Sequence, residues 1–213
     1  MIRALISDFG GVLTTPLIES FLGYQRESGL GLEELGVAML RAAEASGRHP
    51  LYELEKGRIS EREFLAELES RLGDRMKLHG FRDTYFRHLR PNTRMIEYVR
   101  ELRGRGLRTA LLTNNVREWE PQWRAKLPDV DEIFEVIVDS AYVGMRKPEP
   151  AIYELTLERL GNSLRAEECV FVDDIEHNCD AARELGMVAV RFEDTEHAIA
   201  AIERAVVQDE AAR

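Results

Sequence analysis

The sequence predicts an α/β protein in which a doubly wound parallel sheet carries an inserted all-helical domain. Short, continuously apolar runs alternate with amphipathic stretches along most of the chain, as expected where strands are buried on both faces of a parallel sheet. One long stretch near the N-terminus breaks this alternation, because it contains helical patterns without strands between them. This combination is typical of a layered α/β core with a helical insertion.

Five apolar runs are expected to form the sheet. They are Ile2–Ser7, Leu107–Leu112, Phe134–Val138, Cys169–Val172 and Met187–Arg191. Stretches with a helical period lie between most of these runs, and the segment from Met95 to Leu102 carries one such apolar stripe. Gly104 and Gly106 follow this stripe and provide the stop signal of a helix.

The helical insertion is expected between residues 15 and 90. Within it, Ser60–Glu63 has the pattern of a capping box and precedes an apolar stripe of helical period. Pro91 marks the return to the core. We therefore expect a core domain and a cap domain, formed by residues 1–14 with 91–213 and by residues 15–90, respectively.

Charge and composition exclude several classes of function. A net charge of −10 over 213 residues opposes binding to nucleic acid or to an anionic membrane. Cys169 and Cys179 have neither metal-ligand nor disulfide spacing. The apolar start of the chain reaches Asp8 too soon for a signal peptide, and no apolar stretch approaches the ~18 residues of a membrane span. We expect a cytoplasmic protein, monomeric or homodimeric, without a nucleic-acid or membrane partner.

Polar residues follow the expected strands where a ligand site would lie. The strands lead, in chain order, into Asp8, into Thr113 and Asn114, past a short loop to Lys147, and into Asp173–Asp174. Open α/β sheets bind ligands at the carboxyl ends of their strands. Carboxylates there can hold a hard divalent cation, and a lysine and a hydroxyl can bind anionic oxygens.

Each of these features alone has a structural explanation. Asp8 before two glycines fits a turn, and Thr113–Asn115 fits a helix cap. A lone lysine beside a proline is usually a surface residue. Asp173–Asp174 is harder to explain, because adjacent acids at the end of an apolar strand repel each other unless a cation or donors balance them. Occurring together, each near a strand end, the four features favour an active site.

This set of residues resembles the motifs of the haloacid dehalogenase (HAD) superfamily, which contains many phosphatases and has a Rossmann-like core. Four motifs occur in the expected order, as Ile6–Leu13, Leu111–Asn114, Val143–Glu149 and Phe171–Asp174. The insertion is similar to the cap of the branch that includes 2-haloacid dehalogenases, β-phosphoglucomutase and the phosphatase domain of soluble epoxide hydrolase. Glu55–Ser60 and the tail of the fourth motif are close to the last of these. The motifs are specific for the superfamily and carry little information about substrate.

The resemblance implies a magnesium site. Asp8, the backbone carbonyl of Gly10 and Asp174 would hold Mg²⁺, with Asp173 as a further ligand or as an anchor behind the ligands. The metal would reduce the repulsion between the Asp8 carboxylate and a phosphate dianion.

The resemblance also implies roles for the other residues. Asp8 would attack phosphorus and form an aspartyl-phosphate that water then hydrolyses. Lys147 and Thr113 would stabilise charge on the transferring oxygens, and Asn114 would orient the phosphate or the substrate. The resulting prediction is a Mg²⁺-dependent phosphoric monoester hydrolase for a small phosphorylated metabolite.

One position departs from the family pattern. Family phosphatases usually carry a second aspartate, the general acid/base, two residues after the nucleophile, where this chain has Gly10. General acid/base catalysis typically supplies ~10²–10⁴-fold in rate. The enzyme could therefore use substrates with good leaving groups, or a group of the insertion or the substrate could replace the aspartate. Acids of the insertion and His49, His79 and His88 are candidates between which the sequence does not choose.

Two other functions stay open on sequence alone. A metal-independent 2-haloacid dehalogenase also lacks the second aspartate, but it has no need of Asp173–Asp174. A non-catalytic protein that binds phosphate or a metabolite would result if catalysis had been lost. Retention of Asp8, Lys147 and both acids of the fourth motif favours the phosphatase.

Overall fold

The computed structural model describes residues 1–72, 78, 80–161 and 163–210, with side chains to residue 207. Its centre is a parallel sheet with strand order β3-β2-β1-β4-β5, formed by β1 (Ala4–Ser7), β2 (Arg108–Thr113), β3 (Val136–Asp139), β4 (Cys169–Asp173) and β5 (Val188–Arg191). All five expected strands are confirmed, with boundaries shifted by one or two residues. The strand order reverses at β1, which is the doubly wound arrangement.

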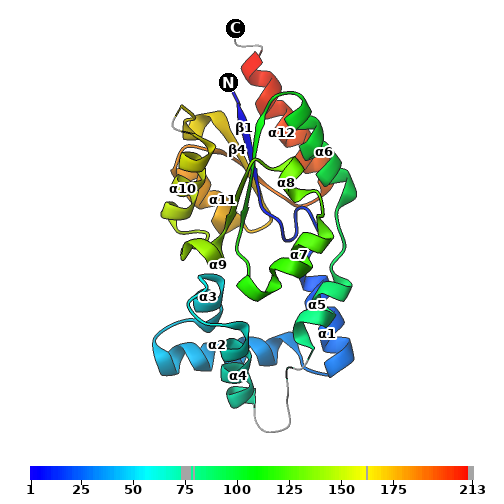
Figure 1. The fold of residues 1–213 in the computed structure, drawn as a ribbon, viewed down its shortest axis with the longest axis vertical. Coiled ribbons are helices and arrows are strands. Elements are labelled where there is room, and N and C mark those ends of the chain that lie inside the picture. Colours follow the sequence, from blue (N-terminus) through cyan, green and yellow to red (C-terminus); the bar gives the residue numbers. More distant parts are fainter. Residues whose placement is uncertain (73–77, 79, 162, 211–213) are drawn as a thin grey trace.

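Helices cover both faces of the sheet (Figure 1). The core helices are α6 (Thr93–Gly104), α7 (Glu120–Lys126), α8 (Val130–Ile133), α9 (Ser140–Val143), α10 (Pro150–Leu160), α11 (Glu176–Glu184) and α12 (Thr195–Glu210). Helices α6, α8 and α12 lie on one face, and α10 and α11 lie on the other. No helix in the described part of the chain has the length and apolar character needed to cross a bilayer.

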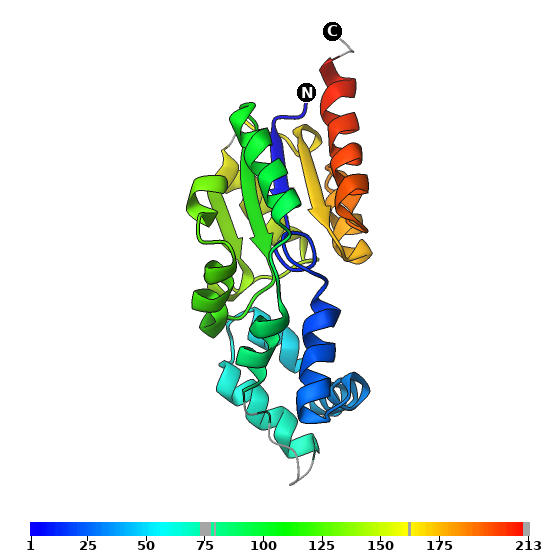
Figure 2. The same ribbon diagram turned by 90° about the vertical axis from the view of Figure 1, so that its right-hand side faces the viewer.

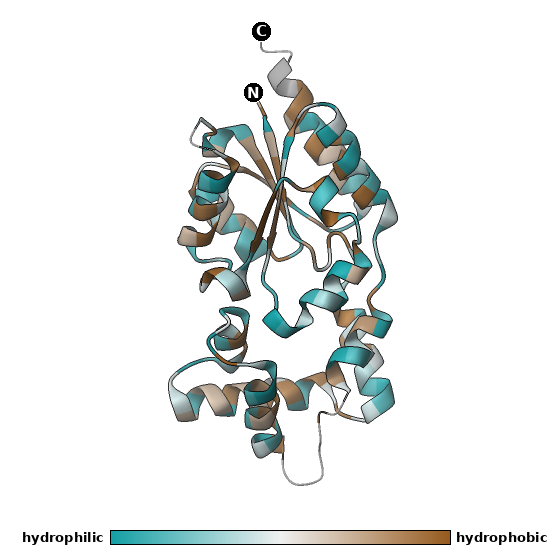
Figure 3. Cartoon of the chain, viewed as in Figure 1, coloured by the Kyte–Doolittle hydropathy of each residue, from teal (hydrophilic) through white to brown (hydrophobic). Residues whose placement is uncertain are grey.

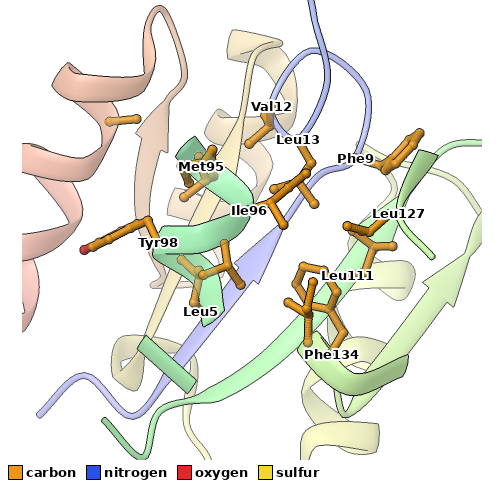
Figure 4. Close-up of a cluster of buried hydrophobic side chains, with 14 of the residues drawn as sticks. Leu5, Phe9, Val12, Leu13, Met95, Ile96, Tyr98, Leu111, Leu127 and Phe134 are labelled. Carbon is orange, nitrogen blue, oxygen red and sulfur yellow. The ribbon is translucent and has the colours of Figure 1, made fainter. Parts of the chain in front are cut away.

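Alternation along the strands divides the core between these two faces. Leu5 and Leu111 contribute to the cluster beneath α6 and α12 (Figure 4), whereas Ile6, Ala110 and Leu112 contribute to the cluster beneath α10 and α11. Successive strand side chains point to opposite faces, so both sets must be apolar when both faces are covered. This explains why the strands read as continuous apolar runs and are the most hydrophobic segments in Figure 3.

The insertion forms a group of helices beyond the carboxyl ends of the strands (Figures 1 and 2). They are α1 (Leu17–Ser28), α2 (Leu32–Ser46), α3 (Pro50–Glu55), α4 (Glu61–Leu72) and α5 (Phe81–His88). The capping box before α4 is present, because Ser60 N–H donates to Glu63 over 2.8 Å and Glu63 N–H donates to the Ser60 hydroxyl over 3.2 Å. These helices enclose an apolar cluster that includes Leu35, Phe64 and Phe81, and Val116 of the core also belongs to it.

Two adjacent segments connect this helical cap to the core. Thr14 and Pro91 form an isolated antiparallel bridge, and Thr15 N–H donates to the Arg90 carbonyl over 2.8 Å. The Asn92 side chain then accepts a hydrogen bond from Met95 N–H and caps α6. The chain therefore leaves and re-enters the core at one place, where the sequence suggests the domain boundary.

Leu111→Ala tests the packing that fixes the sheet. Leu111 is fully buried in β2, so its truncation leaves a cavity and is expected to lower the free energy of unfolding by about 2–5 kcal/mol. Urea denaturation measures this change. The control Val207→Ala, at a position 49% exposed on α12, is expected to stay within about 0.5 kcal/mol of the wild type. A cost below about 1 kcal/mol for Leu111→Ala would contradict the assigned packing.

Candidate active site

The ends of three strands bring the predicted site residues to one edge of the sheet. Asp8 directly follows β1, and its N–H donates to the Val172 carbonyl over 2.9 Å, which places Asp8 beside the end of β4. Thr113 and Asp173 are the last residues of β2 and β4. Both are buried, and so is Asp8. Parallel strands in this register therefore suffice to gather the nucleophile candidate, a hydroxyl and an acid.

Lys147 completes this group from the loop between α9 and α10. Its Nζ atom lies 2.8 Å from Asp8 Oδ1 and 2.6 Å from Asp173 Oδ2, and only 1% of its side chain is exposed. Burial acts to lower the pKa of the ammonium, but the charges of Asp173 and Asp8 outweigh it and raise the pKa above the ordinary value. Lys147 is thus held as a cation between two carboxylates.

The Asn114 side chain positions this lysine. Its Oδ1 atom accepts the Lys147 backbone N–H over 2.8 Å, and its Nδ2 group donates to the Lys147 carbonyl over 3.0 Å. Both ends of the amide therefore bind the backbone of Lys147. The role in orienting phosphate that the resemblance implied for Asn114 stays a prediction.

Asp173 and Asp174 have different environments although they are neighbours. Asp173 is fully buried and accepts hydrogen bonds from Ile175 N–H at 2.9 Å, from the Asn178 amide at 3.0 and 3.1 Å, and from Lys147. These donors fix its carboxylate in place. Asp174 is only partly buried, so its carboxylate has greater freedom to meet a ligand.

The three acids form a cluster that suits a divalent cation. Asp8, Asp173 and Asp174 each offer a carboxylate oxygen, and these oxygens lie within 4.8 Å of one another. Burial raises the pKa of Asp8 to about 8, with Lys147 opposing the shift and the two other acids adding to it. Burial and Asp173 raise the pKa of Asp174 to about 6. When all three acids are ionised, three carboxylates against one ammonium leave an excess of two negative charges, which one Mg²⁺ would balance.

The two glycines after Asp8 serve different purposes. Gly11 has a φ of +78°, and a Cβ atom there would lie 2.3 Å from Asp174 Oδ2, so a side chain is excluded on both grounds. At Gly10 the backbone would accept a side chain. A Cβ atom there would lie 3.0 Å from both methyl groups of Leu17, at the start of α1. The apolar side chain of Leu17 thus lies against the position that the Cβ atom of an aspartate at position 10 would take.

The cap brings Glu55 to the site, a role that the sequence alone did not assign. The Glu55 carboxylate pairs with Arg146 over 2.6 Å, and its backbone carbonyl accepts a hydrogen bond from Ser140 over 2.6 Å. Burial raises the pKa of Glu55, and Arg146 opposes the shift. The neighbouring Gly57, with a φ of +63°, packs so closely that a Cβ atom would lie 2.2 Å from the Ala141 carbonyl oxygen. In the sequence, the feature that could have indicated this position of Glu55 is the resemblance of Glu55–Ser60 to the cap of a family member.

A cavity of about 380 Å³ lies between cap and core. Gly10, Thr113 and Asn114 line it from the core, and Glu55 and Tyr85 line it from the cap; Asp8 and Lys147 are not among its lining residues. Trp119 and Trp123 also line it.

Two of the three histidine candidates for the missing acid, His49 and His88, lie away from the cavity. The His49 ring stacks on Tyr52, with ring centroids 4.2 Å apart, and His88 contacts Glu27 over 2.9 Å. Neither lines the cavity. His79 lies outside the described residues.

Comparison with known proteins extends the likeness over the whole chain. The chain is 31% identical over 208 residues to a sesquiterpene phosphatase from Aspergillus oryzae, with 91% of each chain covered. It is 30% identical over 207 residues to acyl-CoA dehydrogenase family member 10 from Mus musculus, and 26% identical over 220 residues to bifunctional epoxide hydrolase 2 from Rattus norvegicus. These matches cover 94% and 95% of this chain but 19% and 38% of the two longer proteins.

Solved structures share the fold. A HAD-like family hydrolase from Porphyromonas gingivalis superposes with a TM-score of 0.74 at 25% identity, covering 97% of this chain and 98% of the other. A HAD family enzyme from Bacteroides thetaiotaomicron, in complex with magnesium and inorganic phosphate, superposes with a TM-score of 0.66 at 26% identity, covering 92% and 98%.

The family model of haloacid dehalogenase-like hydrolases matches residues 2–186. Sheet order, helical cap and the position of the polar cluster agree with that match. The chain therefore belongs to the haloacid dehalogenase-like hydrolase family.

Proposed function

We propose that the protein is a Mg²⁺-dependent phosphatase that uses Asp8 as nucleophile on a small phosphorylated metabolite. The observation that carries this proposal is the buried cluster of Asp8, Asp173 and Asp174 with Lys147 in contact with two of the acids. The sesquiterpene phosphatase, similar over 91% of this chain, and the bacterial relative in complex with magnesium and inorganic phosphate support it.

The residues present fit a magnesium ion. Asp8, Asp174 and the backbone carbonyl of Gly10 would hold it, and Asp173 would act as an anchor because its oxygens already accept hydrogen bonds from several donors. When bound, Mg²⁺ supplies positive charge that allows a carboxylate and a phosphate dianion to approach each other.

The chemistry would proceed in two displacements at phosphorus. The Asp8 carboxylate attacks phosphorus, the bond to the ester oxygen breaks, and an aspartyl-phosphate forms on Asp8. Water then attacks this phosphate and releases inorganic phosphate. Lys147, fixed by Asn114, and the Thr113 hydroxyl would stabilise charge on the phosphoryl oxygens.

Glu55 is our candidate for the proton donor that Gly10 cannot supply. Among the described residues that line the cavity, it is the carboxylic acid contributed by the cap. Burial raises its pKa above the ordinary value, in the direction that a general acid requires, although the charge of Arg146 opposes the shift. The ion pair with Arg146 holds the side chain at the boundary between cap and core.

Residues 15–90 would act as a cap domain on a core formed by residues 1–14 and 91–213. The two segments that connect them are adjacent and joined by hydrogen bonds, so small backbone rotations there would move the cap as a unit. Closure of such a cap excludes water from the reacting groups.

Asp8→Asn tests the nucleophile. The change is expected to lower kcat on p-nitrophenyl phosphate by at least about 10³-fold, because an amide does not attack phosphorus. Turnover by the wild type should require Mg²⁺ and stop with EDTA. The matched control is Asp139→Asn, a buried acid at the end of β3, which should retain activity within about threefold of the wild type.

Other outcomes would identify the alternatives. Halide release from a 2-haloacid without metal would establish a dehalogenase. Magnesium binding without turnover of any phosphate ester would establish a non-catalytic binder.

Glu55→Gln tests the proton donor through its dependence on the leaving group. We expect a loss of ~10²–10⁴-fold on ethyl phosphate, whose alkoxide must be protonated, and a loss below about tenfold on p-nitrophenyl phosphate. Adding Gly10→Asp with Leu17→Ala, which makes room for the new side chain, should restore part of the rate on ethyl phosphate. Glu53→Gln in the same helix is the control. Equal losses on both substrates would show a structural role only.

The acid cluster also predicts how stability depends on pH. In EDTA, the raised pKa values of Asp174 and Asp8 mean that the folded state binds more protons than the unfolded state between about pH 4 and pH 8. The free energy of unfolding should therefore fall as the pH rises through this range.

Between pH 5 and pH 8, the decrease in the free energy of unfolding should be about 1 kcal/mol smaller in Asp174→Asn than in the wild type. The control Asp83→Asn, which removes an exposed carboxylate, should leave this decrease unchanged. Thermal unfolding with EDTA and with Mg²⁺ measures both effects. Mg²⁺ should raise Tm more at pH 8 than at pH 5, since the metal competes with protons. A stabilisation by Mg²⁺ that is independent of pH would contradict the assignment.

A further inference from the structure

The cavity beside Asp8 has one polar end. Gly10, Thr113 and Asn114 line this end from the core, and Glu55 lines it from the cap. Asp8 and Lys147 are not among the residues that line the cavity. Asn114 binds the Lys147 backbone, however, and Gly10 follows Asp8 by two residues, so a phosphate transferred to Asp8 would lie next to this end. The rest of a substrate molecule must therefore extend into the remaining part of the cavity, within the cap.

That remaining part is apolar. Leucines, one methionine and aromatic rings from α1, α2, α4 and α5 line it, and they include Leu32, Leu35, Met39, Leu65 and Leu68. Edge-to-face and tilted contacts among Phe21, Tyr85 and Trp119 form one wall, with ring centroids 4.9–5.4 Å apart. Among the described lining residues there is no lysine, arginine or histidine.

This lining discriminates between classes of phosphate ester. The hydroxyl groups of a sugar phosphate, or a second phosphate or a carboxylate, would lose water on entering the apolar part without gaining hydrogen bonds or a counter-charge, which is unfavourable. An alkyl, alkenyl or fused-ring group would exchange water for matching apolar surface. A volume of about 380 Å³ is in the range that accommodates an organic group of drug-like size.

Leu17 extends the apolar lining to Gly10, two residues after Asp8. It lines the cavity, and its methyl groups lie 3.0 Å from the position of a Cβ atom at Gly10. Replacement of the acidic side chain by glycine thus leaves an apolar residue beside the ester bond. Glycine in place of aspartate at position 10 also removes a negative charge that would otherwise lie beside the apolar group of the substrate.

We infer that the substrate is a monophosphate ester of a bulky apolar alcohol, whose hydrocarbon part fills the cap cavity while its phosphate meets Asp8. This inference rests on the proposed phosphatase activity and names its substrate class. The cap therefore selects the substrate mainly by burial of apolar surface.

A chain-length series tests the inference. The probes are ethyl, hexyl and decyl phosphate, below their micelle concentrations, with glucose 6-phosphate as the polar comparison and Mg²⁺ present. Complete burial of a methylene is worth about fourfold in binding, so with partial burial kcat/KM should rise by at least about 100-fold from ethyl to decyl phosphate. Glucose 6-phosphate should be no better than ethyl phosphate.

Met39→Glu places a charge in the cavity lining and keeps a good helix former in α2. It should lower the ratio of kcat/KM for decyl to ethyl phosphate by at least about tenfold. The matched control is Leu40→Glu, the same change at the next residue, which is 59% exposed. This control should leave the ratio unchanged.

Different results would overturn the substrate class and the phosphatase activity. Hydrolysis of p-nitrophenyl phosphate through Asp8, without a preference for long chains or with a preference for glucose 6-phosphate, would overturn the substrate class and leave the phosphatase standing. If no ester is hydrolysed, calorimetric binding of decylphosphonate and ethylphosphonate replaces turnover as the readout. Tighter binding of decylphosphonate, weakened by Met39→Glu, supports the apolar cavity, and equal binding overturns it.

Discussion

The buried ammonium of Lys147 is the interaction on which the rest of the site depends. Asp8 follows β1 and Asp173 ends the adjacent strand β4, and their charges would repel each other in a buried position if nothing lay between them. Lys147 contacts both carboxylates, and the Asn114 amide fixes the lysine backbone. Removing one partner from such a buried ionic group destabilises the fold by more than the intact group stabilises it. The arrangement therefore holds Asp8, the proposed nucleophile, in one geometry and leaves an excess of negative charge for a cation to balance when the acids are ionised.

The cap supplies what the sheet edge lacks. Core residues provide the proposed nucleophile, acids and a lysine, but little surface that would distinguish one phosphate ester from another. The cap adds Glu55 at the polar end of the cavity and apolar side chains over the remainder. Close packing of Gly57 against the Ala141 carbonyl shows how one cap segment docks beside the site. The core thus supplies most of the proposed reacting groups, and the cap supplies most of the surface that would select the substrate.

The sequence predicted the sheet and the cap because these depend on local patterns. Apolar runs identify strands buried on two faces, and the Ser60–Glu63 box identifies the start of α4. The gathering of Asp8, Thr113 and Asp173 also followed from pattern, since parallel strands end at the same edge. The positions of Glu55 and Leu17 depend instead on how the cap sits on the core. The lysine-positioning contacts of Asn114, likewise, depend on a loop more than 30 residues away, which no local pattern specifies.

The central claim is that Asp8 becomes phosphorylated during turnover. Acid quench of the wild-type protein within milliseconds of mixing with p-nitrophenyl phosphate and Mg²⁺, followed by peptide mapping by mass spectrometry, tests it most directly. The account predicts a phosphoryl group on the peptide that carries Asp8, formed as p-nitrophenol is released and lost as inorganic phosphate appears. Release of phosphate with no phosphorylated peptide at any time, or with the group on another residue, would contradict it.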